Sequence, residues 1–260
     1  MSPEARLRGL LAACGWPWRA PVEHHRSLAS TNDRLKDLAR AGAPEGSVVW
    51  ADTQTAGRGR HGRAWVSPPG NLYVSVLLRP PMACAPLLPL AAGVAVAEGL
   101  EQLGVSARLK WPNDVVTLER KLGGILAESS SAGPLIDWVV VGIGVNVKAP
   151  LPPDLVDPAV SLVDAGAPLA QVEDVASVVL ARLSVWYHRL LDSGRDALLD
   201  EWRRRSVPWW GQPVEAWSSG TRIVGRAVGV DDDGGLVLEM DDGSRATLRS
   251  GDVRRCRPVS

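Results

Sequence analysis

Cysteine is scarce in this chain of 260 residues: only Cys14, Cys84 and Cys256 occur, and they lie far apart. An odd number of distant cysteines argues against a disulfide framework and against a zinc site made of thiolates. We therefore expect these thiols to be buried or incidental.

An excess of charge of either sign is also absent, because 29 lysines and arginines balance 29 aspartates and glutamates. Without a net charge, the chain as a whole is not drawn to nucleic acid or to a membrane surface. No apolar run approaches the roughly 20 residues that cross a bilayer, and the first residues lack the basic-then-apolar order of a signal peptide. These absences predict a cytoplasmic protein that binds neither DNA nor membranes.

Lysine is rare as well. Of the 29 basic residues only Lys36, Lys110, Lys121 and Lys148 are lysines, which leaves 25 arginines. Lysine is a compact point charge, whereas arginine is a planar fork of donors, so the two do different chemistry. Two of the four lysines fall in the segment 110–121, which also carries other candidate site residues.

Hydrophobic residues make up 45% of the chain, enough for the cores of one large domain and a small one. Apolar periodicity with polar, glycine and proline boundaries predicts helices over residues 4–14, 30–42, 86–103, 172–191 and 197–204. The predicted strands are residues 47–51, 72–78, 108–111, 115–118, 122–127 and 138–147. Because strands and helices do not alternate regularly, we expect an α+β domain over residues 1–208, with a mixed or antiparallel sheet and packed helices.

After Pro208 the pattern changes to short strands separated by hairpin turn signals at Gly220, residues 233–235 and residues 242–243. The predicted strands are residues 214–217, 222–230, 236–240 and 245–249. We expect a small barrel-like β domain over residues 209–260.

A loop rich in glycine and arginine follows strand 47–51 and extends from Gln54 to Arg63. Its three glycines let the backbone turn tightly, and its three arginines supply charge and forked donors that suit phosphates. It lacks the Gly-Lys-Ser/Thr ending of a Walker A loop, and a solvated turn or an Arg-Gly contact to nucleic acid are alternatives. Trp65 follows the loop, where it either stacks on a base or packs into the core.

Three further segments combine unusual residues. In residues 110–114, Asn113 could hydrogen-bond an adenine edge and Asp114 could hold a metal-bound phosphate. The alternative is an Asx-type turn, in which one of these side chains bonds its own backbone. Lys121 begins a strand with a glycine pair, which often marks close approach of a ligand; otherwise this lysine reaches solvent as a strand-end charge. Glycines also interrupt the buried strand 141–146, without forming a dinucleotide-binding fingerprint.

In this order and at these separations, the segments resemble the biotin protein ligase family from about Ser27 to Arg255. The resemblance is carried by Ser30-Thr31-Asn32, Gln54 with the loop 57–63, and residues 110–114, 121–128 and 142–146. The terminal β segment is similar to the small SH3-like C-terminal domain of that family. About 26 residues precede the core, so we expect the monofunctional type without an N-terminal DNA-binding domain.

The resemblance implies a class II biotin/lipoyl ligase-like catalytic domain that activates biotin as biotinyl-5′-AMP. The biotinyl group then passes to a lysine of a biotin carboxyl carrier domain, that of acetyl-CoA carboxylase being the usual partner. Biotin, ATP and Mg²⁺ are the expected ligands, with no tightly bound prosthetic group, and both a monomer and a homodimer occur in the family. Family loops often have arginine where His61 stands, which lowers the positive charge of this loop by one.

The family's site residues correspond to three groups in this sequence. Lys121 and Arg60 are the expected catalytic residues. The expected contacts to biotin come from Ser30, Thr31, Asn32, Gln54, Arg58, Gly59, Arg60 and Lys121. The expected contacts to the nucleotide come from Arg60, Arg63, Trp65, Asn113, Asp114 and Asn146, with Asp114 also an indirect Mg²⁺ ligand.

Lys121 is the residue with the clearest physical role in that chemistry. The biotin carboxylate must approach the α-phosphate of ATP, and two anions at about 4 Å repel by ~4 kcal/mol at an effective dielectric constant of ~20. A fixed ammonium between them reverses the sign and stabilises the charge of the transition state. Lys121 would therefore bridge the two anions while the loop 57–63 closes on biotin and the phosphates.

Three other functions stay open from the sequence. A lipoate- or octanoate-transferring enzyme shares the fold and uses a lysine, but the Gly-Arg loop and the Trp-Pro-Asn-Asp segment favour biotin. A nucleic-acid-binding module would use the loop arginines and would show salt-sensitive binding. A sensor would bind biotinyl-AMP without transferring it.

Overall fold

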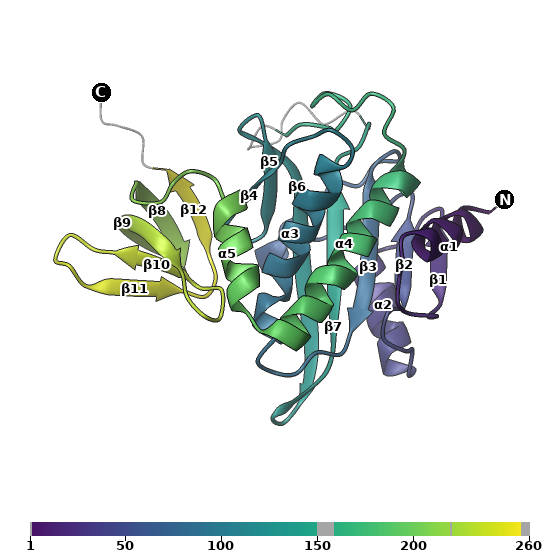
Figure 1. Cartoon of the computed structure of the whole chain (residues 1–260), viewed down its shortest axis with the longest axis horizontal. Coiled ribbons are helices and arrows are strands. Elements are labelled where there is room, and N and C mark those ends of the chain that lie inside the picture. The colour runs from purple at the N-terminus through teal and green to yellow at the C-terminus, as the bar shows by residue number, and fades with distance from the viewer. Residues whose placement is uncertain (1, 150–158, 219, 256–260) are drawn as a thin grey trace.

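Two sheets organise the part of the chain that the computed structural model describes, residues 2–149, 159–218 and 220–255 (Figure 1). The larger sheet contains β1 (Val22–His25), β2 (Val48–Ala51), β3 (Leu72–Leu78), β4 (Arg108–Lys110), β5 (Asp114–Thr117), β6 (Arg120–Ala132) and β7 (Leu135–Val145), and the smaller contains β8 (Pro213–Ser218), β9 (Thr221–Val230), β10 (Leu236–Glu239), β11 (Arg245–Leu248) and β12 (Asp252–Arg255). The α-helices are α1 (Pro3–Ala13), α2 (Thr31–Arg40), α3 (Leu88–Glu101), α4 (Val172–Ser193) and α5 (Asp196–Arg205), and the short 3₁₀ helices are η1 (Arg60–Gly62) and η2 (Ala85–Leu87).

The strand order confirms the predicted α+β class with a mixed sheet. The larger sheet runs β1-β2-β3-β7-β6-β5-β4 and the smaller β11-β10-β9-β8-β12. Only β1 and β2 pair in parallel among the described neighbours, and the others pair antiparallel. The predicted division of the chain at residues 208 and 209 stays a prediction, although the change from helices to short strands begins there.

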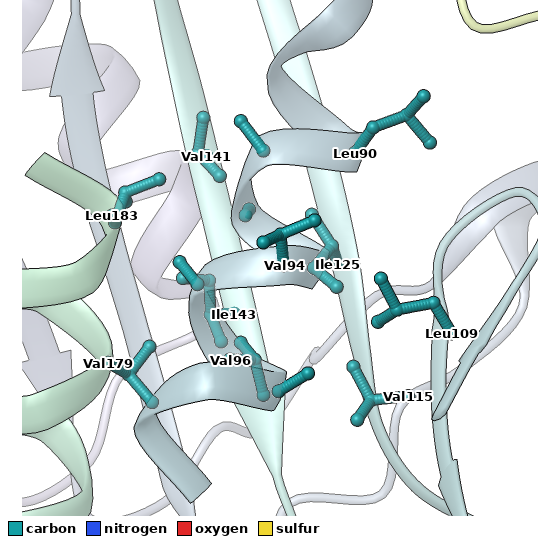
Figure 2. Close-up of a cluster of buried hydrophobic side chains, with 14 of the residues drawn as sticks. Leu90, Val94, Val96, Leu109, Val115, Ile125, Val141, Ile143, Val179 and Leu183 are labelled. Carbon is teal, nitrogen blue, oxygen red and sulfur yellow. The ribbon is translucent and has the colours of Figure 1, made fainter. Parts of the chain in front are cut away.

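The larger sheet carries a different layer on each face (Figure 1). Apolar side chains of α3 and α4 meet one face in a single large cluster with side chains of β6 and β7 (Figure 2). On the other face, α2 packs Leu35 and Ala39 against Val49, Leu77 and Val140. Burying this much apolar surface on the first face supplies the main stabilisation of the fold.

Alternation along the strands decides which side chains reach each face. In β3, Leu72, Val74, Val76 and Leu78 belong to the cluster under α3, whereas Tyr73 and Ser75 point the other way. In β7, Val139, Val141, Ile143 and Val145 join that cluster, which leaves Gly142 and Gly144 on the opposite face. The face beside α2 is therefore lined at its centre by glycines and a serine, and it is open enough to form a site.

The predicted elements differ from the observed ones at several points. The expected helix 86–103 begins with η2, and the α-helix starts at Leu88. Ser30 precedes α2 but makes no capping hydrogen bond through its side chain, because that side chain lies at the site described below. Strands β1 and β12 were not predicted, because their residues show no clear apolar alternation.

Cys14 and Cys84 are free thiols, and Cys256 lies outside the described residues. No helix in the described ranges combines the length and the apolar character needed to cross a bilayer.

Gly99 of α3 tests how tightly α3 and α4 pack, and the exposed Gly9 of α1 serves as its control. A Cβ at Gly99 would lie 3.2 Å from the backbone of Val178 and Val179 in α4, whereas a Cβ at Gly9 of α1 would meet no atom within 4 Å. Alanine favours a helix over glycine by roughly 0.5–1 kcal/mol, but overpacking costs about 1–3 kcal/mol. We expect Gly99→Ala to lower the free energy of unfolding and Gly9→Ala to raise it, as measured by urea denaturation. A stabilised Gly99→Ala variant would contradict this packing.

Candidate active site

A cavity opens on the glycine-lined face of the larger sheet, beside the start of α2. The loop between β2 and β3 borders it on one side, and the end of the smaller sheet borders it on another. Its lining residues are Ser30, Thr31, Asn32, Gln54, Arg58, Gly59, Arg60, Arg63, Ala64, Trp65, Tyr73, Lys110, Trp111, Pro112, Asn113, Asp114, Lys121, Gly124, Ile125, Leu126, Gly142, Ile143, Gly144, Asp252, Val253 and Arg254. The structure thus brings together all the predicted site residues except Asn146.

Glycines form the floor of this cavity because larger side chains would fill it. Gly124 of β6 is paired with Gly144 of β7. A Cβ added to Gly144 would lie 2.9 Å from the ring of Trp65, and one added to Gly142 would lie 2.2 Å from Oδ1 of Asn32. The close approach expected from glycines in these strands is therefore made by two side chains of the site itself.

A buried polar wall stands at the α2 end of the cavity. Ser30, Thr31 and Asn32 are each only 4% exposed. Oε1 of Gln54 accepts hydrogen bonds from the backbone N–H of Thr31 at 2.8 Å and from its hydroxyl at 3.2 Å. Oγ of Ser75 lies 2.8 Å from Oγ1 of Thr31 and 2.6 Å from Oδ1 of Asn32. Polar groups buried in such a network are rigid and present a defined pattern of donors and acceptors to a ligand.

Ser75 was missed by the sequence analysis. The signal for it is a single polar residue in the otherwise apolar strand 72–78, where it is fully buried. A buried hydroxyl needs a partner, and its partners are the two wall residues Thr31 and Asn32.

Lys121 lies at the opposite end of the floor, where β6 begins. Its Nζ is 2.7 Å from Oδ1 of Asp114 and 5.3 Å from the ring centroid of Trp65. The alternative in which Lys121 extends to solvent as a strand-end charge is therefore not observed. A carboxylate and an aromatic face hold the ammonium in the cavity, where an anionic ligand would meet it.

Hydrogen bonds of the backbone and the side-chain amide of Asn113 hold the segment 110–114 to β6. Nδ2 of Asn113 donates to the carbonyl of Ile125 at 2.6 Å, and the N–H of Ile125 donates to the carbonyl of Asn113 at 2.9 Å. The peptide bond between Trp111 and Pro112 is cis. The Asn113 side chain thus has a structural partner in addition to its place in the cavity wall.

The three loop arginines have different partners. Arg58 pairs with Asp33 and Glu128, Nη1 of Arg60 donates to the carbonyl of Gly251 at 3.2 Å, and Arg63 pairs with Asp252. Burial lowers the pKa of Arg60, but a guanidinium stays protonated in proteins. Burial is the largest single effect on the pKa of Asp252 and would raise it, but the hydrogen bond from Arg63 and the nearby positive charges together lower this pKa.

The smaller sheet supplies part of the cavity wall through Asp252, Val253 and Arg254. None of these three was predicted as a site residue, because they belong to the missed strand β12. Only tertiary folding brings this strand to a loop almost 200 residues earlier, so no local pattern marks it.

Asn146 is the predicted site residue that the structure does not bring to the cavity. It is 5% exposed, and its amide donates to the carbonyl of Val160 at 3.2 Å. Its backbone N–H donates to the carbonyl of Leu122 at 2.8 Å. The predicted contact of Asn146 with adenine stays a prediction, and in this structure Asn146 ties the end of β7 to neighbouring backbone.

No cluster of three or more histidine, cysteine, aspartate or glutamate residues suited to a metal ion occurs within the described ranges. The carboxylates of the cavity wall are Asp114 and Asp252. Mg²⁺ in nucleotide sites is commonly held by one or two carboxylates together with the substrate phosphates. The wall thus offers carboxylates that fit a magnesium ion arriving with a nucleotide.

The charged cluster behind the polar wall gives a prediction for acid stability. The hydrogen bond from Arg58 is the largest cause that lowers the pKa of Asp33 from 3.8 to about 2. Because the folded-state pKa is depressed, this contribution to stability is present above about pH 4 and is lost as the pH falls through about 2.

We expect Asp33→Asn to lower the free energy of unfolding near neutral pH by up to about 1 kcal/mol, since Asp33 is partly exposed and solvent screens the pair. The difference from the wild type should shrink between about pH 4 and pH 2 in urea denaturation series. A difference that stays constant over that range would contradict the pairing.

Two family models match the chain. That of the Biotin/lipoate A/B protein ligase family matches residues 25–146, and that of the Biotin protein ligase C terminal domain matches residues 210–254. The bifunctional ligase/repressor BirA of Bacillus subtilis is 35% identical over 237 residues, which cover 88% of this chain and 72% of that protein. The biotin–[acetyl-CoA-carboxylase] ligase of Mycobacterium tuberculosis is 35% identical over 268 residues, 98% of this chain and 96% of that protein.

A solved structure supports the same relationship. The biotin protein ligase from Aquifex aeolicus in complex with biotin and ATP superposes with a TM-score of 0.79 and 30% identity, over 91% of this chain and 99% of that chain. The matched models cover segments of both sheets, and a relative with 35% identity is matched over nearly its whole length. This chain therefore belongs to the biotin protein ligase family.

Proposed function

We propose that this chain is an ATP-dependent ligase that joins biotin to AMP and then transfers the biotinyl group to a lysine of a biotin carboxyl carrier domain. The observation that carries the proposal is the single cavity that has a buried polar wall at one end and Lys121 with the loop arginines at the other. Such a cavity suits a ligand with a polar head, an apolar middle and an anionic end.

Biotin has that composition. Its ureido ring offers two N–H donors and a carbonyl acceptor, which hydroxyl and amide groups can match. We assign the ring to the wall of Ser30, Thr31, Asn32 and Gln54. The alkyl chain then runs along the cavity from this wall, so that the carboxylate extends toward Lys121.

In the first step a carboxylate oxygen of biotin attacks the α-phosphorus of ATP, and the bond from that phosphorus to the pyrophosphate oxygen breaks. Lys121 lies between the two anions and stabilises the charge of the transition state, while Arg60 and Arg63 bind the phosphates. We place the adenine on the indole of Trp65, beside Asn113. No side chain acts as a nucleophile, because the substrate carboxylate does.

Mg²⁺ would be held by the ATP phosphates with Asp114 nearby, and it would supply charge neutralisation for the departing pyrophosphate. Asp114 also holds Lys121 in place through their 2.7 Å ion pair.

In the second step the neutral amine of the acceptor lysine attacks the carbonyl carbon of biotinyl-5′-AMP. An amide bond forms, the bond to the phosphate oxygen breaks, and AMP leaves while the amine loses a proton. The mixed anhydride is reactive toward water, so exclusion of solvent by the arginine loop preserves it between the steps.

A direct test mixes the purified protein with biotin, ATP, Mg²⁺ and a carrier domain, followed by mass spectrometry of the carrier. We expect a mass gain of one biotinyl group that depends on ATP. Labelling by lipoate in preference to biotin would support the lipoate alternative. Pyrophosphate release in the presence of biotin with no labelled carrier would support adenylation and contradict the proposed transfer to this acceptor.

Lys121→Ala tests the first step. We expect biotin-dependent pyrophosphate release to fall by about 10²–10³-fold, as for removal of a preorganised electrostatic group, with unchanged thermal unfolding. Lys148→Ala is the matched control, because Lys148 is an exposed lysine away from the cavity wall. Near-normal pyrophosphate release by Lys121→Ala would refute the role that we assign to this lysine.

A further inference from the structure

Four charged side chains form a cluster directly behind the polar wall. Asp33 and Lys36 come from α2, Arg58 from the arginine loop and Glu128 from β6. Nζ of Lys36 lies 2.8 Å from a carboxylate oxygen of both Asp33 and Glu128. Nη2 of Arg58 lies 2.6 Å from Oδ1 of Asp33 and 3.3 Å from Oε2 of Glu128. Two cations and two anions thus alternate, and the cluster is neutral as a whole.

Glu128 connects this cluster to the polar wall. Its Oε2 accepts a hydrogen bond from Nδ2 of Asn32 at 2.8 Å, and the same nitrogen donates to the carbonyl of Leu126 at 3.2 Å. On its other side Asn32 accepts from Ser75 through Oδ1. Asn32 and Leu126 both line the cavity, whereas Glu128 does not. Glu128 therefore reaches the cavity through the residues that it contacts.

The carboxylate determines how the Asn32 amide is oriented. An ionised carboxylate only accepts hydrogen bonds, so the NH₂ group must face Glu128 and the carbonyl must face Ser75. Both N–H groups of Asn32 are then in use, and its remaining hydrogen-bonding capacity is that of an acceptor. A glutamine at position 128 can donate as well as accept, so it would permit either orientation of Asn32.

Electrostatics keep Glu128 ionised in this position. Burial is the largest single effect on the pKa of Glu128 and would raise it, but the hydrogen bonds from Lys36 and Asn32 together with the charges of Lys36 and Arg58 lower it. Loss of this charge would leave the two cations Arg58 and Lys36 with Asp33 as the one carboxylate of the cluster. Arg58 is the first arginine of the loop, so its two carboxylate partners hold the start of the loop against α2 and β6.

We propose that Glu128 is a positioning residue for the biotin end of the cavity, which sets the polarity of the Asn32 amide and anchors the arginine loop through Arg58. This inference rests on the proposed function. Arg58 then acts by holding the loop, while the phosphate-binding charge comes from arginines further along it. Asp33 still pairs with Arg58 when Glu128 is lost, so the loop keeps its main anchor. The effect of losing Glu128 should therefore be largest in biotin binding and small in ATP binding.

The test compares Glu128→Gln and Glu128→Asp with Glu23→Gln. Glu23 also pairs with an arginine of α2, Arg34, and its side chain is 27% exposed against 29% for Glu128, but it does not line the cavity or touch the wall. Isothermal titration with biotin alone gives the affinity, and biotin-dependent pyrophosphate release gives KM for each substrate and kcat.

For Glu128→Gln we expect the Kd and KM for biotin to rise by about tenfold or more, in keeping with the loss of charged hydrogen bonds. KM for ATP and kcat should stay within about threefold of the wild type, since Lys121 and its surroundings are unchanged. Glu128→Asp keeps the charge and should give intermediate values, and Glu23→Gln should match the wild type.

A Glu128→Gln variant with wild-type biotin affinity would overturn the inference. So would an equal loss in biotin affinity, ATP affinity and kcat, because that pattern indicates general damage to the fold. A wild-type protein that neither binds biotin nor releases pyrophosphate would instead refute the proposed function itself, and the wild-type measurement separates these two failures.

Discussion

The site depends on one ammonium group that is held at the beginning of β6. Lys121 lies between the carboxylate of Asp114 and the indole of Trp65, and the position of this indole requires a floor without side chains. Gly124 and Gly144 make that floor because they are paired across two neighbouring strands on the same face of the sheet. The register of β6 and β7 therefore decides whether Lys121 can take the bridging position that we propose for it.

A chain without net charge has to arrange its charges locally. Here carboxylates surround the loop arginines: Asp33 and Glu128 hold Arg58, and Asp252 of the smaller sheet pairs with Arg63. These pairs hold the loop against α2, β6 and the smaller sheet. The smaller sheet thereby becomes part of the cavity, since its last strand lines the wall and pairs with the arginine loop.

Much of the fold and of the cavity lining was predictable, because short stretches of the sequence mark the elements that carry them. The apolar strand 72–78 and the helix start at residues 30–32 were marked by periodicity and polar boundaries, and the glycine- and arginine-rich loop was marked by composition. Ser75 left a weaker signal, a single polar residue in an apolar strand. Asp252 left none, because β12 has one buried apolar residue, Val253, and pairs with a distant strand. Asn146 was predicted as a ligand contact because it is a polar residue at a strand end. In the structure it lies outside the cavity wall, and its amide donates to a backbone carbonyl.

Biotin-dependent exchange of labelled pyrophosphate into ATP measures most directly whether this cavity activates biotin, because the exchange requires reversible formation of the mixed anhydride and needs no acceptor protein. We expect labelled ATP to accumulate with biotin, and to accumulate neither without an acid nor with lipoate in its place. Absence of exchange with biotin, at concentrations where biotin is shown to bind, would contradict the assignment of Lys121 and the loop arginines to adenylation.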